Sequence, residues 1–235
     1  MKRIKQICGV GVICALILFL WHPVHAGFYF ESEQVTEGIS DQPDQGILVK
    51  NYLTPGASRT DTEHIITILD YRNMIAYELN ANDKTYTQRD MRTMNGMSKM
   101  GPAERQQLDQ MMKQMADSTK IVPTDETEAI AGYNCRKYDV QFMMAKGVYW
   151  VTTEIKGYQE LRELVQDMGK AFEQNPMTKQ MNILGMMAQI DGFPVKTVMD
   201  VMGGRVTTTL KMIEQRPLDK SLFEIPKEYR LVEKR

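Results

Sequence analysis

QGILVKNYLT at 45–54 is followed by EHIITILDY at 63–71, MIAYELN at 74–80 and KTYTQR at 84–89. All four segments are rich in β-branched and aromatic residues, which favour strands. Short pairs of turn-forming residues separate them, namely Pro55-Gly56, Arg72-Asn73 and Asn82-Asp83. This close spacing is typical of antiparallel hairpins, so the first half of the chain is expected to form a meander.

The hydrophobic period changes to that of a helix after Gly101. Pro102 suits the first position of a helix, and the apolar residues that follow recur on one helical face. These residues are Leu108, Met111, Met112 and Met115. Strands are expected again at 133–142 and 148–155.

Two further amphipathic helices are expected after these strands. One face of the first helix carries Tyr158, Leu161, Leu164, Val165, Met168 and Phe172. Asn175 is a suitable N-cap for the second helix, whose apolar residues are Met177, Met181, Leu184 and Ala188. Strands at 194–201 and 205–214 follow.

Sheets and amphipathic helices bury their apolar faces against each other. We therefore expect an α+β fold in which a curved antiparallel sheet carries about three helices on its concave face. No repeat or linker divides residues 27–235, so they are expected to form a single domain. The contact between the helices and the sheet would form an apolar cavity, lined by Leu108, Met111, Met112, Met115, Leu161, Leu164, Met168, Met181 and Leu184.

The first 26 residues have the three parts of a secretory signal peptide. Three basic residues lie within 2–5, an uncharged apolar run extends from Ile7 to Leu20, and small or modest side chains lead to Ala26. The apolar run has 14 residues, fewer than the ~20 that a membrane-spanning helix needs. We expect cleavage after Ala26 and a periplasmic or secreted protein.

The composition of the mature chain argues against nucleic acid as a partner. Without residues 1–26, 26 basic and 30 acidic residues remain, which gives a net charge of −4. The charges are scattered, whereas phosphate binding needs a basic stripe. Only one cysteine, Cys135, remains after cleavage, so no internal disulfide is expected and a hydrophobic core has to stabilise the domain.

Several short motifs resemble known families. GILVK (46–50), Arg59, IITILD (65–70), YELN (77–80) and KTYT (84–87) are similar to the opening strands of the periplasmic lipoprotein-carrier superfamily, the LolA-like half-barrels. AGYNCRKY (131–138), LFEIP (222–226) and Tyr229 resemble more closely a family of bacterial secreted domains, domain of unknown function 4412. The resemblance implies a half-barrel whose concave face is filled by helices.

The helix stripes and the resemblance together point to a non-enzymatic module that binds a hydrophobic ligand. An acyl chain, lipid or lipoprotein would lie between the helices and the concave sheet, and no cofactor is expected. Transient association with the membrane or with an envelope protein is a further expectation. A structural or protein-interaction domain without a ligand is the second alternative, after the copper-binding one given below.

Few residues of the mature chain could support catalysis or bind a hard metal ion. The mature chain keeps one histidine, His64, and one cysteine, Cys135. It has no HExxH, GxSxG or glycine-rich phosphate motif. A nucleophile pair of Cys135 and His64 is the enzymatic alternative, but we expect His64 at the surface and Cys135 in the core. The acidic run at 125–128 lacks the glycine of a calcium loop and is expected to be a solvated loop.

Methionine is unusually frequent, with 18 residues after position 26. Met91, Met94, Met97 and Met100 recur every three residues. Thioethers select Cu(I) over hard cations, so these four residues are the candidate site of a copper-binding alternative. Methionine is also flexible and polarizable, which suits an apolar surface that repacks around varied partners. Both interpretations stay open.

Overall fold

The computed structural model describes residues 26–39, 43–93, 101–142, 145–175, 178–179, 185–186, 188–201 and 203–233. Its strands are β1 (Ala26–Glu37), β2 (Gln45–Thr54), β3 (Ala57–Asp61), β4 (Ile65–Asp70), β5 (Ile75–Asn80), β6 (Thr85–Asp90), β7 (Lys120–Ile130), β8 (Tyr133–Phe142), β9 (Ala145–Thr152), β10 (Phe193–Val201), β11 (Gly204–Pro217) and β12 (Arg230–Leu231). Its helices are α1 (Pro102–Asp117), α2 (Tyr158–Phe172) and the short 3-10 helix η2 (Lys220–Phe223).

The strands of this described part form one twelve-stranded sheet in the order β12-β6-β5-β4-β3-β2-β1-β11-β10-β9-β8-β7. All neighbouring strands pair antiparallel except β12, which pairs parallel with β6. β1 and β11 pair near the centre of the sheet, so an early and a late segment of the chain join its two halves. The pairing register shifts in β1, β7 and β10, as it does at a β-bulge or other irregularity, and β-bulges increase the local twist of a sheet.

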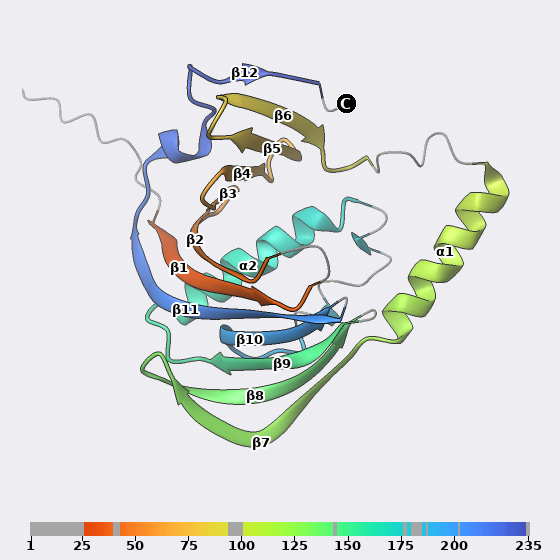
Figure 1. Ribbon diagram of the computed structural model, residues 1–235, viewed down its shortest axis with the longest axis vertical. Coiled ribbons are helices and arrows are strands. Elements are labelled where there is room, and N and C mark those ends of the chain that lie inside the picture. The colour runs from red at the N-terminus through yellow and green to blue at the C-terminus, as the bar shows by residue number, and fades with distance from the viewer. Residues whose placement is uncertain are drawn as a thin grey trace, which may run out of the picture.

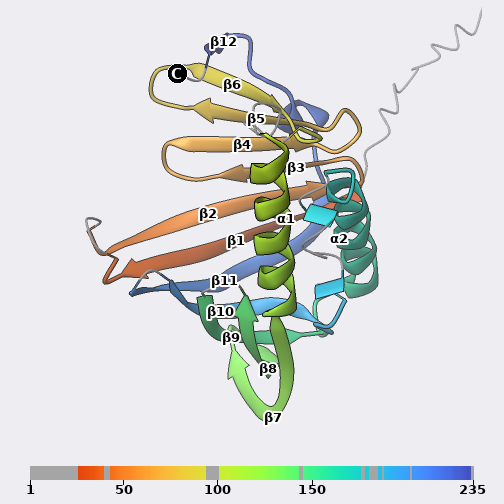
Figure 2. The same ribbon diagram turned by 90° about the vertical axis from the view of Figure 1, so that its right-hand side faces the viewer.

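The sheet is curved and open, with β12 and β7 at its two edges. In Figure 1 the strands form a C that opens toward α1. In this view α2 lies within the C, and α1 runs along its open side. Figure 2, seen from the open side, shows α1 in front of the strands and α2 toward one end of them. This position of α1 follows from the topology, because α1 connects β6, near one edge, to β7 at the other.

The expected α+β class and the curved antiparallel sheet are confirmed. β2 and β8 have the predicted bounds, and Pro102 is the first residue of α1. Two α-helices are present in the described residues, and the expected third, at 175–188, lies mostly outside them. No helix of the described part is both long and apolar enough to cross a membrane.

The expectation of a solvated loop at 125–128 was wrong, because these residues belong to β7. β7 is the last strand of the sheet, and all four residues of the acidic run are exposed there. Edge strands tolerate proline and charged side chains, which discourage pairing with other chains. Because Pro123 and the charged side chains are unusual within a strand, the sequence pattern did not predict β7, which lies at the edge of the sheet.

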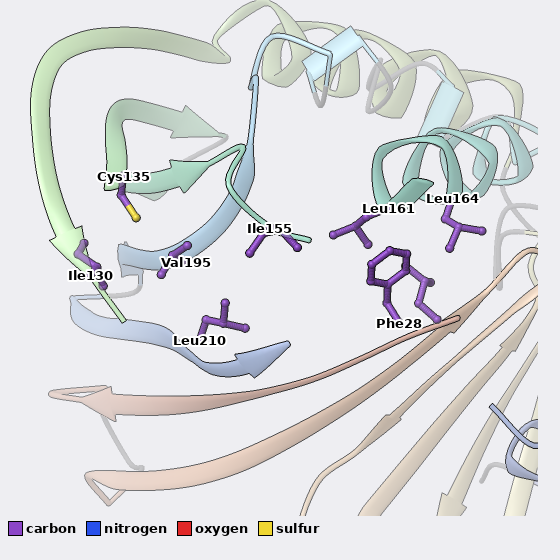
Figure 3. Close-up of a cluster of buried hydrophobic side chains, with 9 residues drawn as sticks. Phe28, Ile130, Cys135, Ile155, Leu161, Leu164, Val195 and Leu210 are labelled. Carbon is purple, nitrogen blue, oxygen red and sulfur yellow. The ribbon is translucent and has the colours of Figure 1, made fainter. Parts of the chain in front are cut away.

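The main core lies between α2 and the sheet and contains buried residues from β1, β2, β7, β8, β10 and β11 (Figure 3). Fully burying one such large apolar side chain contributes roughly 1.5–3 kcal/mol, so this contact fixes the position of α2. Its buried residues are Phe28, Leu53, Ile130, Cys135, Ile155, Leu161, Leu164, Val195 and Leu210. Two smaller buried clusters lie around Tyr71 and Met74 and around Tyr138 and Val140.

Candidate functional site

α2 presents two neighbouring stripes to different surroundings. One stripe is buried in the core and includes Leu164, which is 9% exposed, and Ala171, which is 8% exposed. The adjacent stripe consists of residues spaced by three and four along the helix, which places them on one face. It borders a pocket, and its members are Tyr158, Leu161, Arg162, Val165, Gln166 and Lys170.

The pocket has a volume of about 610 Å³, within the range of roughly 300–1,000 Å³ typical of small-molecule sites. α2 forms one wall. Opposite α2 lie Tyr149 of β9 and residues that lead into or begin β10, namely Gly185, Ala188, Ile190, Gly192, Phe193 and Pro194. Most of the lining side chains are apolar or aromatic, so the pocket favours a hydrophobic ligand.

Asp191 joins the two walls at the rim of the pocket. Its Oδ1 accepts a hydrogen bond from the Tyr158 hydroxyl at 3.3 Å and lies 3.8 Å from Nη1 of Arg162. The backbone N–H of Asp191 donates to the Tyr138 hydroxyl at 3.4 Å. Burial, followed by the nearby Asp191 carboxylate, raises the pKa of Tyr158, so this hydroxyl remains a donor at neutral pH.

The predicted cavity residues of α2 have different positions. Leu161 lines the pocket and also packs in the core, with 1% exposed. Leu164 and Met168 pack against the core on the neighbouring stripe. Met181 and Leu184, from the third expected helix, lie outside the described residues.

Three of the predicted residues of α1, namely Leu108, Met111 and Met112, are not among the residues that line this pocket. Met112 is buried, Leu108 is half-buried and Met111 is 45% exposed. The side chain of Met115 lies outside the described part. Binding of a ligand by the nine predicted residues stays a prediction.

Sequence reasoning missed the wall opposite α2. Tyr149 belongs to a strand, and Ile190, Phe193 and Pro194 lie at the junction with β10. None of them belongs to a helical stripe, and they are brought to α2 only by the pairing of β9 with β10. Phe193 and Pro194 were the only local sequence features that could have indicated this wall of the pocket.

Cys135 and His64 lie in the environments that the sequence predicted. Cys135 is 1% exposed and its Sγ donates to the Tyr133 carbonyl at 3.5 Å. The pKa of this thiol is raised, mainly by burial. The raised pKa disfavours the thiolate form that a nucleophile needs. The His64 side chain is 62% exposed, with Glu63 beside it.

We expect Cys135→Ala to lower the free energy of unfolding by about 1 kcal/mol, because it removes a small buried group from the core. Cys135→Ser should cost more, since it buries a polar hydroxyl that loses its hydration even though the Tyr133 carbonyl can accept a hydrogen bond from it. Denaturant unfolding measures both. Rapid reaction of the native thiol with a maleimide, at the rate of the unfolded chain, would contradict the burial of Cys135.

The copper alternative stays a prediction. Met94, Met97 and Met100 lie outside the described residues. Met91 packs partly buried against Tyr71 and Met74, and its carbonyl accepts a hydrogen bond from the Asn175 side chain at 2.6 Å. Among the described residues, no group of three or more histidine, cysteine or acidic side chains is placed to hold a metal ion.

The fold and the pocket together define a curved open-sheet protein with a helix in its concave side and an apolar site beside that helix. The chain belongs to the family described as Domain of unknown function (DUF4412), whose model matches residues 52–229. The family resemblance drawn from the sequence motifs is therefore confirmed. No curated protein matches the chain in sequence.

Solved structures with a similar chain course have low sequence identity. PNGF-II matches with a TM-score of 0.41 and 14% identity, over 89% of this chain but 31% of its own, so the chain spans about a third of PNGF-II. An uncharacterized conserved protein from Thermus thermophilus matches with a TM-score of 0.46 and 8% identity, over 89% of this chain and 91% of its own. A LolA superfamily protein from Nitrosomonas europaea has a TM-score of 0.35 and 7% identity, with 86% and 91% covered.

Proposed function

We propose that the protein is a non-enzymatic module that binds the acyl chain of a lipid or lipoprotein in the pocket beside α2. The observation that carries this proposal is the apolar lining of the pocket, with Val165 and Leu161 on one side and Ile190 and Phe193 on the other. Transfer of each methylene of an acyl chain from water to such a site contributes roughly 0.8 kcal/mol.

The proposal includes export. The first 26 residues have the pattern of a signal peptide, and the proposed ligand is found where exported proteins meet membranes. A module that shields one acyl chain from water would act between membranes or at a membrane surface. The chemistry needed is binding and release, which requires neither a nucleophile nor a metal ion.

We expect single-chain amphiphiles to stabilise the native protein against thermal unfolding. At a hundred times the dissociation constant, a ligand that binds only the folded state adds roughly 2.7 kcal/mol. A series of chain lengths is the informative titration, because the affinity should rise with each methylene until the pocket is filled. Thermal unfolding followed by circular dichroism, with each ligand below its micelle concentration, measures the effect.

A matched pair of variants shows where the ligand binds. Both Ala188 and Ala103 are exposed, but Ala188 lines the pocket and Ala103, on α1, does not. Ala188→Trp should fill the pocket and remove the stabilisation, and Ala103→Trp should leave it intact. The same response to ligand in both variants, or no response of the wild type to any chain length, would rule out acyl binding at this site and favour a domain without a ligand.

A further inference from the structure

The pocket carries a row of polar side chains on one edge of α2. Arg162, Gln166 and Lys170 are four residues apart, so they lie above one another on the helix. Arg162 and Lys170 are eight residues apart, which corresponds to roughly 12 Å along the axis. One compact head group of a ligand therefore contacts one end of the row and not both.

The Arg162 end is the better site for an anion. α2 begins at Tyr158, and the start of a helix favours negative charge. The Tyr158 hydroxyl adds a second donor beside the guanidinium. At the other end, Lys170 Nζ lies 2.7 Å from an Asp167 oxygen on the same helix, and its side chain is 68% exposed against 46% for Arg162.

A carboxylate of the protein already lies at the Arg162 end. Oδ1 of Asp191 is 3.3 Å from the Tyr158 hydroxyl and 3.8 Å from Nη1 of Arg162. Both distances are long, and the Asp191 side chain is 68% exposed. An exposed ion pair of this kind contributes little to stability, whereas a well-placed carboxylate or phosphate can form two short parallel hydrogen bonds with an arginine.

We infer that Arg162 and Tyr158 bind the anionic head of a single-chain amphiphile, and that Asp191 competes with this head for the same donors. The inference rests on the proposed acyl-chain function and adds the class of head group. The tail lies against Val165, Ile190 and Phe193, and the carboxylate or phosphate displaces Asp191 at the rim. A neutral head leaves Asp191 in place.

Three ligands with one palmitoyl chain test this inference: palmitate, palmitoyl lysophosphatidate and the neutral monopalmitoylglycerol. Their dissociation constants are measured by displacement of a fluorescent fatty acid from the full mature protein. Arg162→Gln should weaken the binding of the anionic ligands about 10-fold, because it removes a charge-assisted contact. Asp191→Asn should tighten their binding by about 3-fold, since it removes only a weak exposed pair. The neutral ligand should respond to neither change.

Lys113→Gln is the control for the loss of one positive charge, because Lys113 is exposed on α1 and does not line the pocket. It should leave all three dissociation constants unchanged, and thermal unfolding checks that every variant is folded. A comparison of the dissociation constants of palmitate and palmitoyl lysophosphatidate for the wild type shows whether the site prefers a carboxylate or a phosphate.

The possible failures are distinguishable. Two results would overturn the head-group assignment and leave acyl binding intact. One is an equal loss of affinity for all three ligands in Arg162→Gln, and the other is equal affinity of the wild type for neutral and anionic ligands. Weaker binding of the anionic ligands by Asp191→Asn would overturn the inference that Asp191 competes with the head group. If none of the three ligands binds the wild type, the proposed function itself falls.

Discussion

We expect Leu164→Asp to unfold the protein, and the adjacent Val165→Asp to leave it folded but unable to bind an acyl chain. Leu164 is 9% exposed and packs in the core with Phe28 and Leu161. Removal of a buried leucine side chain costs roughly 2–5 kcal/mol, and an unpaired carboxylate in the same place adds a desolvation penalty. A total of about 5 kcal/mol or more equals the stability of many domains.

Val165 is half-buried and lies at the border between the core and the pocket. A carboxylate there can reach water through the pocket, so we expect a loss of stability of about 1–2 kcal/mol. Its charge would occupy the surface against which the ligand's tail packs. Because a bound tail would have to dehydrate this charge, the affinity should fall by roughly 100-fold or more.

Urea unfolding and ligand titration separate these two effects. The matched controls are Leu164→Met, which conserves volume and should cost less than ~1.5 kcal/mol, and Val165→Thr, which conserves shape without adding a charge. If Val165→Asp unfolded the protein as completely as Leu164→Asp, the second stripe of α2 would belong to the core and not to a pocket. Retained binding in folded Val165→Asp would place the ligand elsewhere.

The sequence predicted the strands whose apolar residues alternate, but not the central strand β1. After Ala26 and Gly27, β1 carries the aromatic residues 28–30 and continues with mostly polar residues. Ser32 and Thr36 are nevertheless buried, with 7% and 9% exposed. Because these buried positions are polar, the alternation that identifies a half-buried strand is missing. Only pairing with β2 and β11 on its two sides places β1 in the sheet.

The candidate site was only partly predictable for a related reason. The apolar residues of α2 cover more than one stripe, and their periodicity does not tell which stripe packs in the core and which borders a pocket. On α1, the neighbours Met111 and Met112 differ in exposure, at 45% and 5%. The opposite wall of the pocket comes from β9 and from residues before and within β10, and local patterns carry no information on that tertiary contact.

We expect Gly192→Ala to be among the most destabilising single-methyl additions in this fold. Gly192 lies between Asp191 and β10, with φ of +144°, a backbone conformation that L side chains rarely adopt. An added Cβ would lie 2.8 Å from Cγ2 of Val151 and 3.1 Å from the backbone nitrogen of Thr152. Both residues are buried, with 2% and 3% exposed. Strain and overpacking together should cost about 3 kcal/mol.

The same change should act on the pocket, because the chain around Gly192 can relieve the clash only by moving away from β9. Asp191 and Phe193 would move with it, so the affinity for neutral and anionic amphiphiles should fall together. Gly203→Ala is the matched control: φ is +81° and nothing lies within 4 Å of an added Cβ, so it should cost only about 1–2 kcal/mol of backbone strain and leave binding unchanged. Urea unfolding and ligand titration of both variants decide the matter. Equal destabilisation by the two changes would mean that Gly192 is required for its φ alone, and that its close packing on Val151 does not hold the wall of the pocket.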